Sequence, residues 1–258
     1  MDLQLTNMCF LVSGGSRGLG LATAEALAAE GANVVIVGRD PQTAIAAAAG
    51  IGNQARAFVG DLADPQIAER AVAEARSHFD RCDGALVSVG GPPPGSGLAN
   101  TDDEWRDAFE SVFLGALRVI RAVLDQDLNP VTVASPERAL LLVLSTSAKN
   151  PIPGLTISNG LRPGLAMLVK DLSDSYAAQN VRINSILPGR IETARTLQLD
   201  ENTADAAASR AANESRIPMR RYGRPEEFGA TAAFLLSPKA SYITGAAISV
   251  DGGSGRSL

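Results

Sequence analysis

A glycine-rich turn near the N-terminus carries the first residues with recognisable chemistry. The turn, SGGSRGLG at 13–20, follows an apolar run at 8–12 and precedes an alanine-rich stretch with helical spacing at 19–30. Glycines between a strand and a helix let the backbone approach a pyrophosphate, which the N-terminus of the helix attracts. We therefore expect a dinucleotide to bind here, and a merely tight strand-to-helix turn is the alternative. The candidate cofactor residues of this turn are Gly14, Ser16, Arg17, Gly18, Leu19 and Gly20.

The end of the second apolar run, 34–37, is where the adenosine ribose of the cofactor is expected. An NAD-preferring enzyme places an acid there, whereas this chain has Gly38 followed by Arg39. The glycine leaves room for a 2′-phosphate, and the guanidinium groups of Arg39 and Arg17 match its charge. The sequence therefore predicts NADP(H), with NAD(H) less favoured. Two alternatives stay open: Asp40 accepts from the ribose, or both arginines are solvated surface charges.

Short apolar runs alternate with helical stretches along the whole chain. The runs, mostly unbroken by polar residues, are 8–12, 34–37, 57–59, 85–89, 140–144, 181–186 and 246–250. The stretches with helical spacing are 19–30, 42–49, 65–79, 104–124, 157–178 and 225–236. This alternation predicts an α/β fold, a single Rossmann-type doubly wound parallel sheet of about seven strands with helices on both faces. No linker divides the chain, so we interpret residues 1–258 as a single dinucleotide-binding domain with its ligands at the carboxyl ends of the strands.

The composition excludes several classes of protein. With 45% hydrophobic and 20% charged residues, the chain can bury a sizeable core and is not disordered. A formal net charge of −5 argues against nucleic acid or an anionic membrane as a partner, because either requires clustered Lys and Arg. One histidine and two distant cysteines predict no metal site. The first residues lack a basic secretory signal and no aliphatic run approaches roughly 20 residues, so we expect a cytoplasmic protein.

The turns that follow the predicted strands resemble, in combination, those of the short-chain dehydrogenase/reductase family, and the resemblance covers nearly the whole chain. The glycine spacing at 14–20, the pair at 61–62, the Ser-Val-Gly-Gly segment at 88–91, the Pro-Gly turn at 188–193 and the segment at 242–253 carry it. It implies that the pair contacts adenine, that the second segment lies beside the ribose and that the Pro-Gly turn holds the nicotinamide amide. The cofactor residues implied by these turns are Asp61, Leu62, Ser88, Gly90, Pro188, Gly189, Ile191 and Thr193.

The catalytic positions depart from the pattern of the family. The family has a Tyr thirty positions before the Pro of the Pro-Gly turn, a Lys four positions after that Tyr and a Ser thirteen before it. Counting back from Pro188 gives Ser158, Arg162 and Ser145 at these positions, and Val112 stands where the family has an Asn. The chain therefore looks like an atypical branch, otherwise similar to 3-oxoacyl carrier-protein reductases. We take Ser145, Ser158 and Arg162 as the candidate catalytic residues.

Proton donation to the substrate oxygen is the step that these replacements affect. A general acid works best with a pKa near the operating pH, whereas a serine hydroxyl is a far weaker acid than tyrosine and arginine keeps its proton. Ser158 and Arg162 share a helical face about 6 Å apart along the axis, so we expect Arg162 to bind the nicotinamide ribose while Ser158 only donates a hydrogen bond. Alternatively, Ser158 caps the helix and Arg162 is an ordinary surface arginine. Pro163 is expected to kink this helix.

Other groups remain candidates for the proton donor. Ser145 is expected to donate a hydrogen bond to a substrate oxygen. Lys149, Arg190 and Glu192 are predicted to lie on loops at the same edge of the sheet, where any of them could supply the proton directly or through water.

The sequence thus predicts an NADP(H)-dependent oxidoreductase that transfers a hydride between the nicotinamide and a small carbonyl or alcohol substrate. The alternative is a catalytically impaired nucleotide-binding protein that acts as a sensor or assembly partner. The stretches 104–124 and 242–250 are too apolar for solvated surfaces, and we expect a homotetramer that covers both.

Overall fold

The computed structural model describes residues 1–125, 137–201 and 205–257. The strands within them form one parallel sheet in the order β3-β2-β1-β4-β5-β6-β7, which confirms the predicted fold class. Their bounds are β1 (Cys9–Ser13), β2 (Asn33–Gly38), β3 (Ala55–Val59), β4 (Gly84–Ser88), β5 (Arg138–Val143), β6 (Val181–Pro188) and β7 (Ala247–Val250). The order reverses between β1 and β4, and ligands of doubly wound sheets bind at the carboxyl side of that point.

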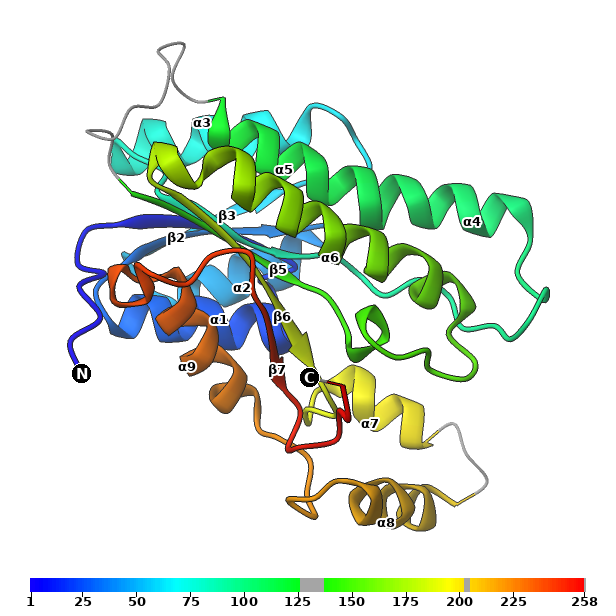
Figure 1. Ribbon diagram of the computed structural model, residues 1–258. Coiled ribbons are helices and arrows are strands. Elements are labelled where there is room, and N and C mark those ends of the chain that lie inside the picture. The colour runs from blue at the N-terminus through cyan, green and yellow to red at the C-terminus, as the bar shows by residue number, and fades with distance from the viewer. Residues whose placement is uncertain (126–136, 202–204, 258) are drawn as a thin grey trace.

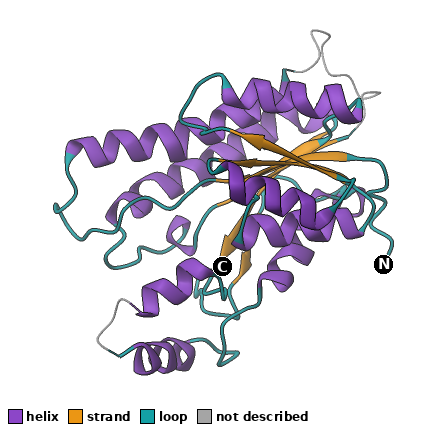
Figure 2. Cartoon of the chain, turned by 180° about the vertical axis from the view of Figure 1, so that it is seen from behind, coloured by secondary structure: helices purple, strands orange, loops and turns teal. Residues whose placement is uncertain are grey.

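Helices cover both faces of the sheet (Figure 1). One face carries α1 (Gly18–Ala29), α2 (Pro41–Ile51) and α9 (Pro225–Leu236). The other carries α3 (Ile67–Phe79), α5 (Gly115–Leu124) and α6 (Thr156–Tyr176), with α4 (Asp102–Ala108) leading into α5 through the π-helix η1 (Phe109–Leu114). Figure 2 shows the two helical layers from the opposite side. The short 3-10 helices are η2 (Thr146–Ala148), η3 (Ala177–Gln179) and η4 (Pro238–Ala240).

The strands are buried on both faces, as their unbroken apolar sequences predict. Along β1, Phe10 and Val12 belong to the core on the α1 and α9 side, whereas Cys9 and Leu11 belong to the core on the α3, α5 and α6 side. Successive side chains of a strand point to opposite faces, so each strand contributes to both cores. The sheet is therefore a rigid frame whose carboxyl edge fixes the turns described below.

Two local features differ from the sequence-based expectation. Two further helices, α7 (Ala194–Glu201) and α8 (Ala206–Arg216), lie beyond the carboxyl ends of the strands, where no element was predicted (Figure 1). The helix predicted at 104–124 is interrupted by η1, a rare geometry that often marks functional regions. Pro163 lies inside α6, which is continuous from Thr156 to Tyr176. None of the described helices is long and apolar enough to span a membrane.

Candidate active site

The turn between β1 and α1 is packed so closely that glycine is required at several positions. Gly14 and Gly18 have φ of 60° and 56°, a backbone region that side chains disfavour. A Cβ atom on Gly20 would lie 2.3 Å from the carbonyl oxygen of Gly14, and one on Gly14 would lie 2.8 Å from that of Ser88. The turn is therefore held against the end of β4.

The N-terminus of α1 has its first-turn N–H groups free of side-chain caps. The N-cap residue is Arg17, which is exposed and makes no capping hydrogen bond. Uncapped N–H groups at a helix N-terminus attract anions such as phosphate. A Cβ atom built on Gly38 would lie 3.3 Å from Ser16 Oγ, so the turn also touches the end of β2. Leu19 follows in the first turn of the helix and packs on the adjoining core. These features fit the phosphates of a dinucleotide.

The residues after β2 include a helix cap, Asp40, and a weakly paired cation, Arg39. Asp40 caps α2 by accepting a hydrogen bond from the backbone N–H of Thr43 at 2.8 Å, which lowers the pKa of its carboxyl group. This carboxylate is engaged with the helix, which disfavours the alternative that it binds the ribose. Arg39 is 72% exposed on its side chain, and its Nη1 lies 3.8 Å from Asp61 Oδ2. Such exposed pairs are weak, so the Arg39 guanidinium is free to reorient toward a phosphate.

The pair after β3 presents one carboxylate and one buried leucine. Asp61 Oδ1 accepts a hydrogen bond from the backbone N–H of Ala63 at 3.0 Å, and its side chain stays exposed. The Leu62 side chain is buried in the core and lies against Gly115 of α5. Arg118 Nη1 donates to the Leu62 carbonyl oxygen at 3.1 Å. The side chain and the carbonyl oxygen of Leu62 therefore both have partners within the protein.

Ser88 joins the glycine turn to the centre of the sheet. Ser13 Oγ donates to the Ser88 carbonyl oxygen at 3.0 Å and accepts from the Ser88 N–H at 2.9 Å. In the sheet register Ser88 pairs with Val143, the last residue of β5. Nothing lies within 4 Å of a Cβ atom built on Gly90, so the backbone there borders open space. The predicted ribose segment thus lies between the glycine turn and the end of β5.

The turn after β6 lies against the glycine turn. A Cβ atom on Gly189 would lie 2.6 Å from the Cβ of Asp251, so this turn is locked against the segment after β7. Ile191 is buried and pairs with the backbone of Gly223. The methyl group of Thr193 lies 3.5 Å from a Cβ atom built on Gly18. The Pro-Gly turn and the glycine turn therefore meet at one edge of the sheet, although Thr193 comes 173 residues after Gly20 in the sequence.

Three serines and an arginine gather at the end of β5. Ser145 Oγ accepts from the backbone N–H of Ser147 at 3.1 Å, which leaves the hydroxyl proton of Ser145 available to another acceptor. Ser147 Oγ lies 3.0 Å from Ser158 Oγ, and both side chains are buried. Ser147 was not among the sequence candidates, because the Ser-Thr-Ser run does not show which hydroxyl faces Ser158. The η2 turn places that of Ser147 there. The residue before α6 is Leu155, so the alternative that Ser158 caps the helix is wrong.

Arg162 completes what we call the serine–arginine cluster, Ser145, Ser147, Ser158 and Arg162. Its side chain is buried, which overturns the alternative of an ordinary surface arginine. Its Nη1 donates to the carbonyl oxygen of Val143 at 2.8 Å, and its Nε has no hydrogen-bond partner. Burial, with a smaller contribution from the positive charge of Arg195, lowers the pKa of Arg162 to about 10. The guanidinium group remains cationic at neutral pH.

The tyrosine and the asparagine expected from the family resemblance have no counterpart in this cluster. Val112, at the Asn position, is buried in the core within η1. The chain has three tyrosines. Tyr222 donates to Asp200 Oδ2 at 2.8 Å, Tyr176 ends α6 about 27 Å along the helix from Ser158, and Tyr242 is fully exposed. No tyrosine therefore belongs to this cluster of serines and arginine.

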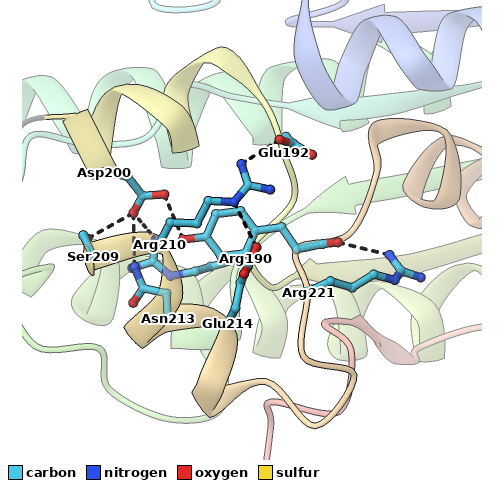
Figure 3. A network of polar contacts seen from close by, with 9 residues as sticks. Arg190, Glu192, Asp200, Ser209, Arg210, Asn213, Glu214 and Arg221 are labelled. Atoms are coloured by element: carbon cyan, nitrogen blue, oxygen red, sulfur yellow. Dashed lines mark hydrogen bonds and ion pairs between the residues drawn. The ribbon is translucent and has the colours of Figure 1, made fainter. Parts of the chain in front are cut away.

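A polar network ties the turn after β6 to α7 and α8 (Figure 3). Arg190 Nη1 lies 3.5 Å from the buried Asp200, which also accepts from Tyr222. Glu192 accepts from Arg210 at 2.8 Å, and the Arg210 guanidinium lies 5.0 Å from the centre of the Tyr222 ring. Arg190 and Glu192 thus have partners in this network, which weakens their candidacy as proton donors. The remaining alternative donor, Lys149, is exposed at the end of η2.

Comparison with known proteins places the chain in a family. Residues 14–255 match the family model described as enoyl-(acyl carrier protein) reductase. L-sorbose reductase from Gluconobacter frateurii, solved with NADPH and L-sorbose, aligns over all of both chains with a TM-score of 0.90 and 26% identity. 3-Ketoacyl-(acyl-carrier-protein) reductase from Brucella melitensis, solved with NADH, covers 97% of this chain and 99% of its own with a TM-score of 0.86 and 28% identity.

A third solved structure is similar over nearly the whole length of the chain. It is a short-chain oxidoreductase from Pseudomonas aeruginosa PAO1 described as containing an atypical catalytic center, with a TM-score of 0.89, 27% identity and coverage of 98% of this chain and 99% of its own. The chain belongs to the short-chain dehydrogenase/reductase family of oxidoreductases.

Proposed function

We propose that this protein is an NADP(H)-dependent oxidoreductase that transfers a hydride between the nicotinamide and a carbonyl or alcohol substrate. The observation that carries the proposal is the meeting of the cofactor turns and the serine–arginine cluster at one edge. Thr193 lies against Gly18. Ser88 pairs with Val143, and the carbonyl oxygen of Val143 accepts a hydrogen bond from Arg162. A dinucleotide on the glycine turn would thus extend along the carboxyl ends of β1 and β4 toward Arg162.

The preference for NADP(H) rests on the residues of this chain, because relatives have been solved with NADPH and with NADH. Gly38 offers no acid to the ribose, and Asp40 is engaged as a helix cap. Arg39 is held only by a long contact with Asp61, and Arg17 is exposed nearby. Two available guanidinium groups favour a 2′-phosphate over a 2′-hydroxyl.

Each residue of the serine–arginine cluster has a separate proposed role. A reduced nicotinamide supplies the hydride when it is bound. The free hydroxyl proton of Ser145 would hydrogen-bond to the substrate oxygen, while the positive potential of Arg162 would stabilise negative charge that develops there. Ser158, tied to Ser147, would donate a hydrogen bond but would be a poor proton donor, since an aliphatic hydroxyl is a weak acid. We therefore expect slow turnover.

A second candidate function is nucleotide binding without turnover. It is favoured by the position of all three tyrosines outside the serine–arginine cluster and by the mutual hydrogen bond of Ser147 and Ser158. In that case the protein would act as a sensor or an assembly partner. The cytoplasmic location and the homotetramer stay predictions under either function.

The test is NADPH oxidation against a panel of carbonyl compounds, combined with NADPH binding by fluorescence, for the wild type, Ser145→Ala and Ser158→Ala. Ser175→Ala is the matched control, because Ser175 lies on α6 but is exposed near its far end. We expect every variant to bind NADPH and slow turnover to disappear in Ser145→Ala but not in Ser175→Ala. Tight NADPH binding with no turnover in any variant favours the second candidate, and absence of NADPH binding contradicts the proposal.

A further inference from the structure

Two arginines near the end of β5 have no acidic partner. Arg162 is 5% exposed, and Arg195, on α7, is exposed. A Cβ atom built on Gly91 would lie 2.3 Å from Arg195 Nη2, so the Arg195 guanidinium rests on the backbone that follows β4. Among residues 1–125, 137–201 and 205–257, no carboxylate lies within ion-pairing distance of either guanidinium. The site therefore concentrates positive charge without a counter-ion.

A second buried arginine in the same protein shows how this fold otherwise satisfies such a charge. Arg182 Nε pairs with Glu137 at 2.5 Å, and its terminal nitrogens donate to the carbonyl oxygens of Leu235 at 2.7 Å and Ser237 at 2.9 Å. Arg162, by contrast, donates to one carbonyl oxygen and leaves Nε unpartnered. Burying a cation without a counter-ion is costly, so a retained unpaired guanidinium points to an anionic ligand.

The cofactor does not provide that anion at this position. The phosphates of a dinucleotide would occupy the uncapped N-terminus of α1, and a 2′-phosphate would face Arg39 beyond β2. The nicotinamide ribose, which would lie nearest Arg162, is neutral. The second ligand, the substrate, is then the remaining source of an anion.

We infer that the substrate is a carbonyl compound with a carboxylate or phosphate group, and that this anionic group binds between Arg162 and Arg195. This inference rests on the proposed function and adds the class of substrate. Arg162 lies on α6 and Arg195 on α7. One anion would therefore join the two helices through charge-assisted hydrogen bonds to both guanidinium groups. Gly91 permits the approach of Arg195, because any larger residue would occupy the position of its guanidinium group.

The experiment measures binding rather than turnover. The protein is saturated with NADP⁺, and two matched pairs of probes are titrated by calorimetry: acetoacetate against acetoacetamide, and dihydroxyacetone phosphate against dihydroxyacetone. The single tryptophan, Trp105, packs against Gly160 on α6 and gives a second, fluorescence readout. The variants are Arg195→Gln and Arg162→Lys, and Arg216→Gln is the control because Arg216 is exposed at the end of α8.

We expect at least one anion to bind about tenfold or more tightly than its neutral partner, the size of effect typical of a charge-assisted hydrogen bond. A preference in the acetoacetate pair identifies the anionic group of the substrate as a carboxylate, and a preference in the dihydroxyacetone pair identifies it as a phosphate. Arg195→Gln should remove most of the preference, and Arg216→Gln should keep it. Because Arg195 is exposed, its replacement tests the inference even if the buried Arg162 variant does not fold.

Three results would overturn the inference: equal binding of anion and neutral partner in both pairs, a preference unchanged in Arg195→Gln, or displacement of NADP⁺ by the anion. The last would assign both arginines to the phosphates of the cofactor. If NADP⁺ itself does not bind, the proposed function fails, while the same titrations of the free protein still test the arginine pair.

Discussion

Replacement of Arg39 by alanine should weaken NADPH binding selectively. The Arg39 guanidinium faces solvent, and its nearest carboxylate is Asp61 at 3.8 Å. A charge-assisted hydrogen bond to a 2′-phosphate contributes about 1.5–3 kcal/mol, whereas the exposed pair that must open contributes about 0–1 kcal/mol. The net loss is about 0.5–3 kcal/mol, or a factor of about 2–160 in the dissociation constant.

The assay is fluorescence titration of NADPH and NADH at fixed ionic strength. NADH binding should stay the same in Arg39→Ala, because NADH has no 2′-phosphate. The NADPH preference of the wild type should shrink as salt is raised, since the contact is exposed and therefore screened.

Arg56→Ala is the matched control for this substitution. Arg56 lies on β3 with its Nε 4.0 Å from Glu74, a similar exposed pair outside the proposed site. An equal loss of NADH and NADPH affinity in Arg39→Ala, or no loss at all, would refute the assignment of Arg39 to the 2′-phosphate.

Two further predictions concern assembly and acid stability. Phe109 and Tyr242 are exposed aromatic residues in the two stretches expected at interfaces, so light scattering at micromolar concentration should give a tetramer, and a monodisperse monomer would contradict this. Arg221 and the backbone N–H of Arg224 lower the pKa of Glu227 to about 2 from 4.5, so this contribution to stability is complete above pH 4.5 and disappears as the pH falls through 2. Thermal unfolding at pH 6 and pH 2.5 should show a larger loss for the wild type than for Glu227→Gln, and equal losses would exclude the linkage.

The sheet and the cofactor turns could be predicted because local sequence determines them. Strands buried on both faces have unbroken apolar runs, and glycine is forced wherever a Cβ atom would strike backbone, as at Gly14 and Gly20. The strand bounds shifted by at most two residues because strand ends depend on pairing, as when β5 begins at Arg138 rather than at 140. The helix α8 was missed because none of its residues is buried, so no apolar stripe marks it.

The charge state of the site could not be predicted, because it depends on contacts between distant segments. Nothing local distinguishes Arg162 from a surface arginine until β5 places the Val143 carbonyl oxygen against it. The contact of Arg195 with Gly91 joins residues more than a hundred positions apart. The role of Asp40 was ambiguous for a related reason, since the same carboxylate suits a ribose or a helix cap, and only the start of α2 decides between them.

The most direct test of the account is the rate at which NADPH reduces a neutral ketone in the double variant Ser158→Tyr with Arg162→Lys. The account holds that the chain binds the cofactor and lacks an efficient proton donor, and general acid catalysis is worth about 10²–10⁴-fold. It predicts that the double variant turns over faster than the wild type by at least the lower end of this range, with NADPH affinity retained. An unchanged or lower rate in a folded variant that still binds NADPH would contradict it.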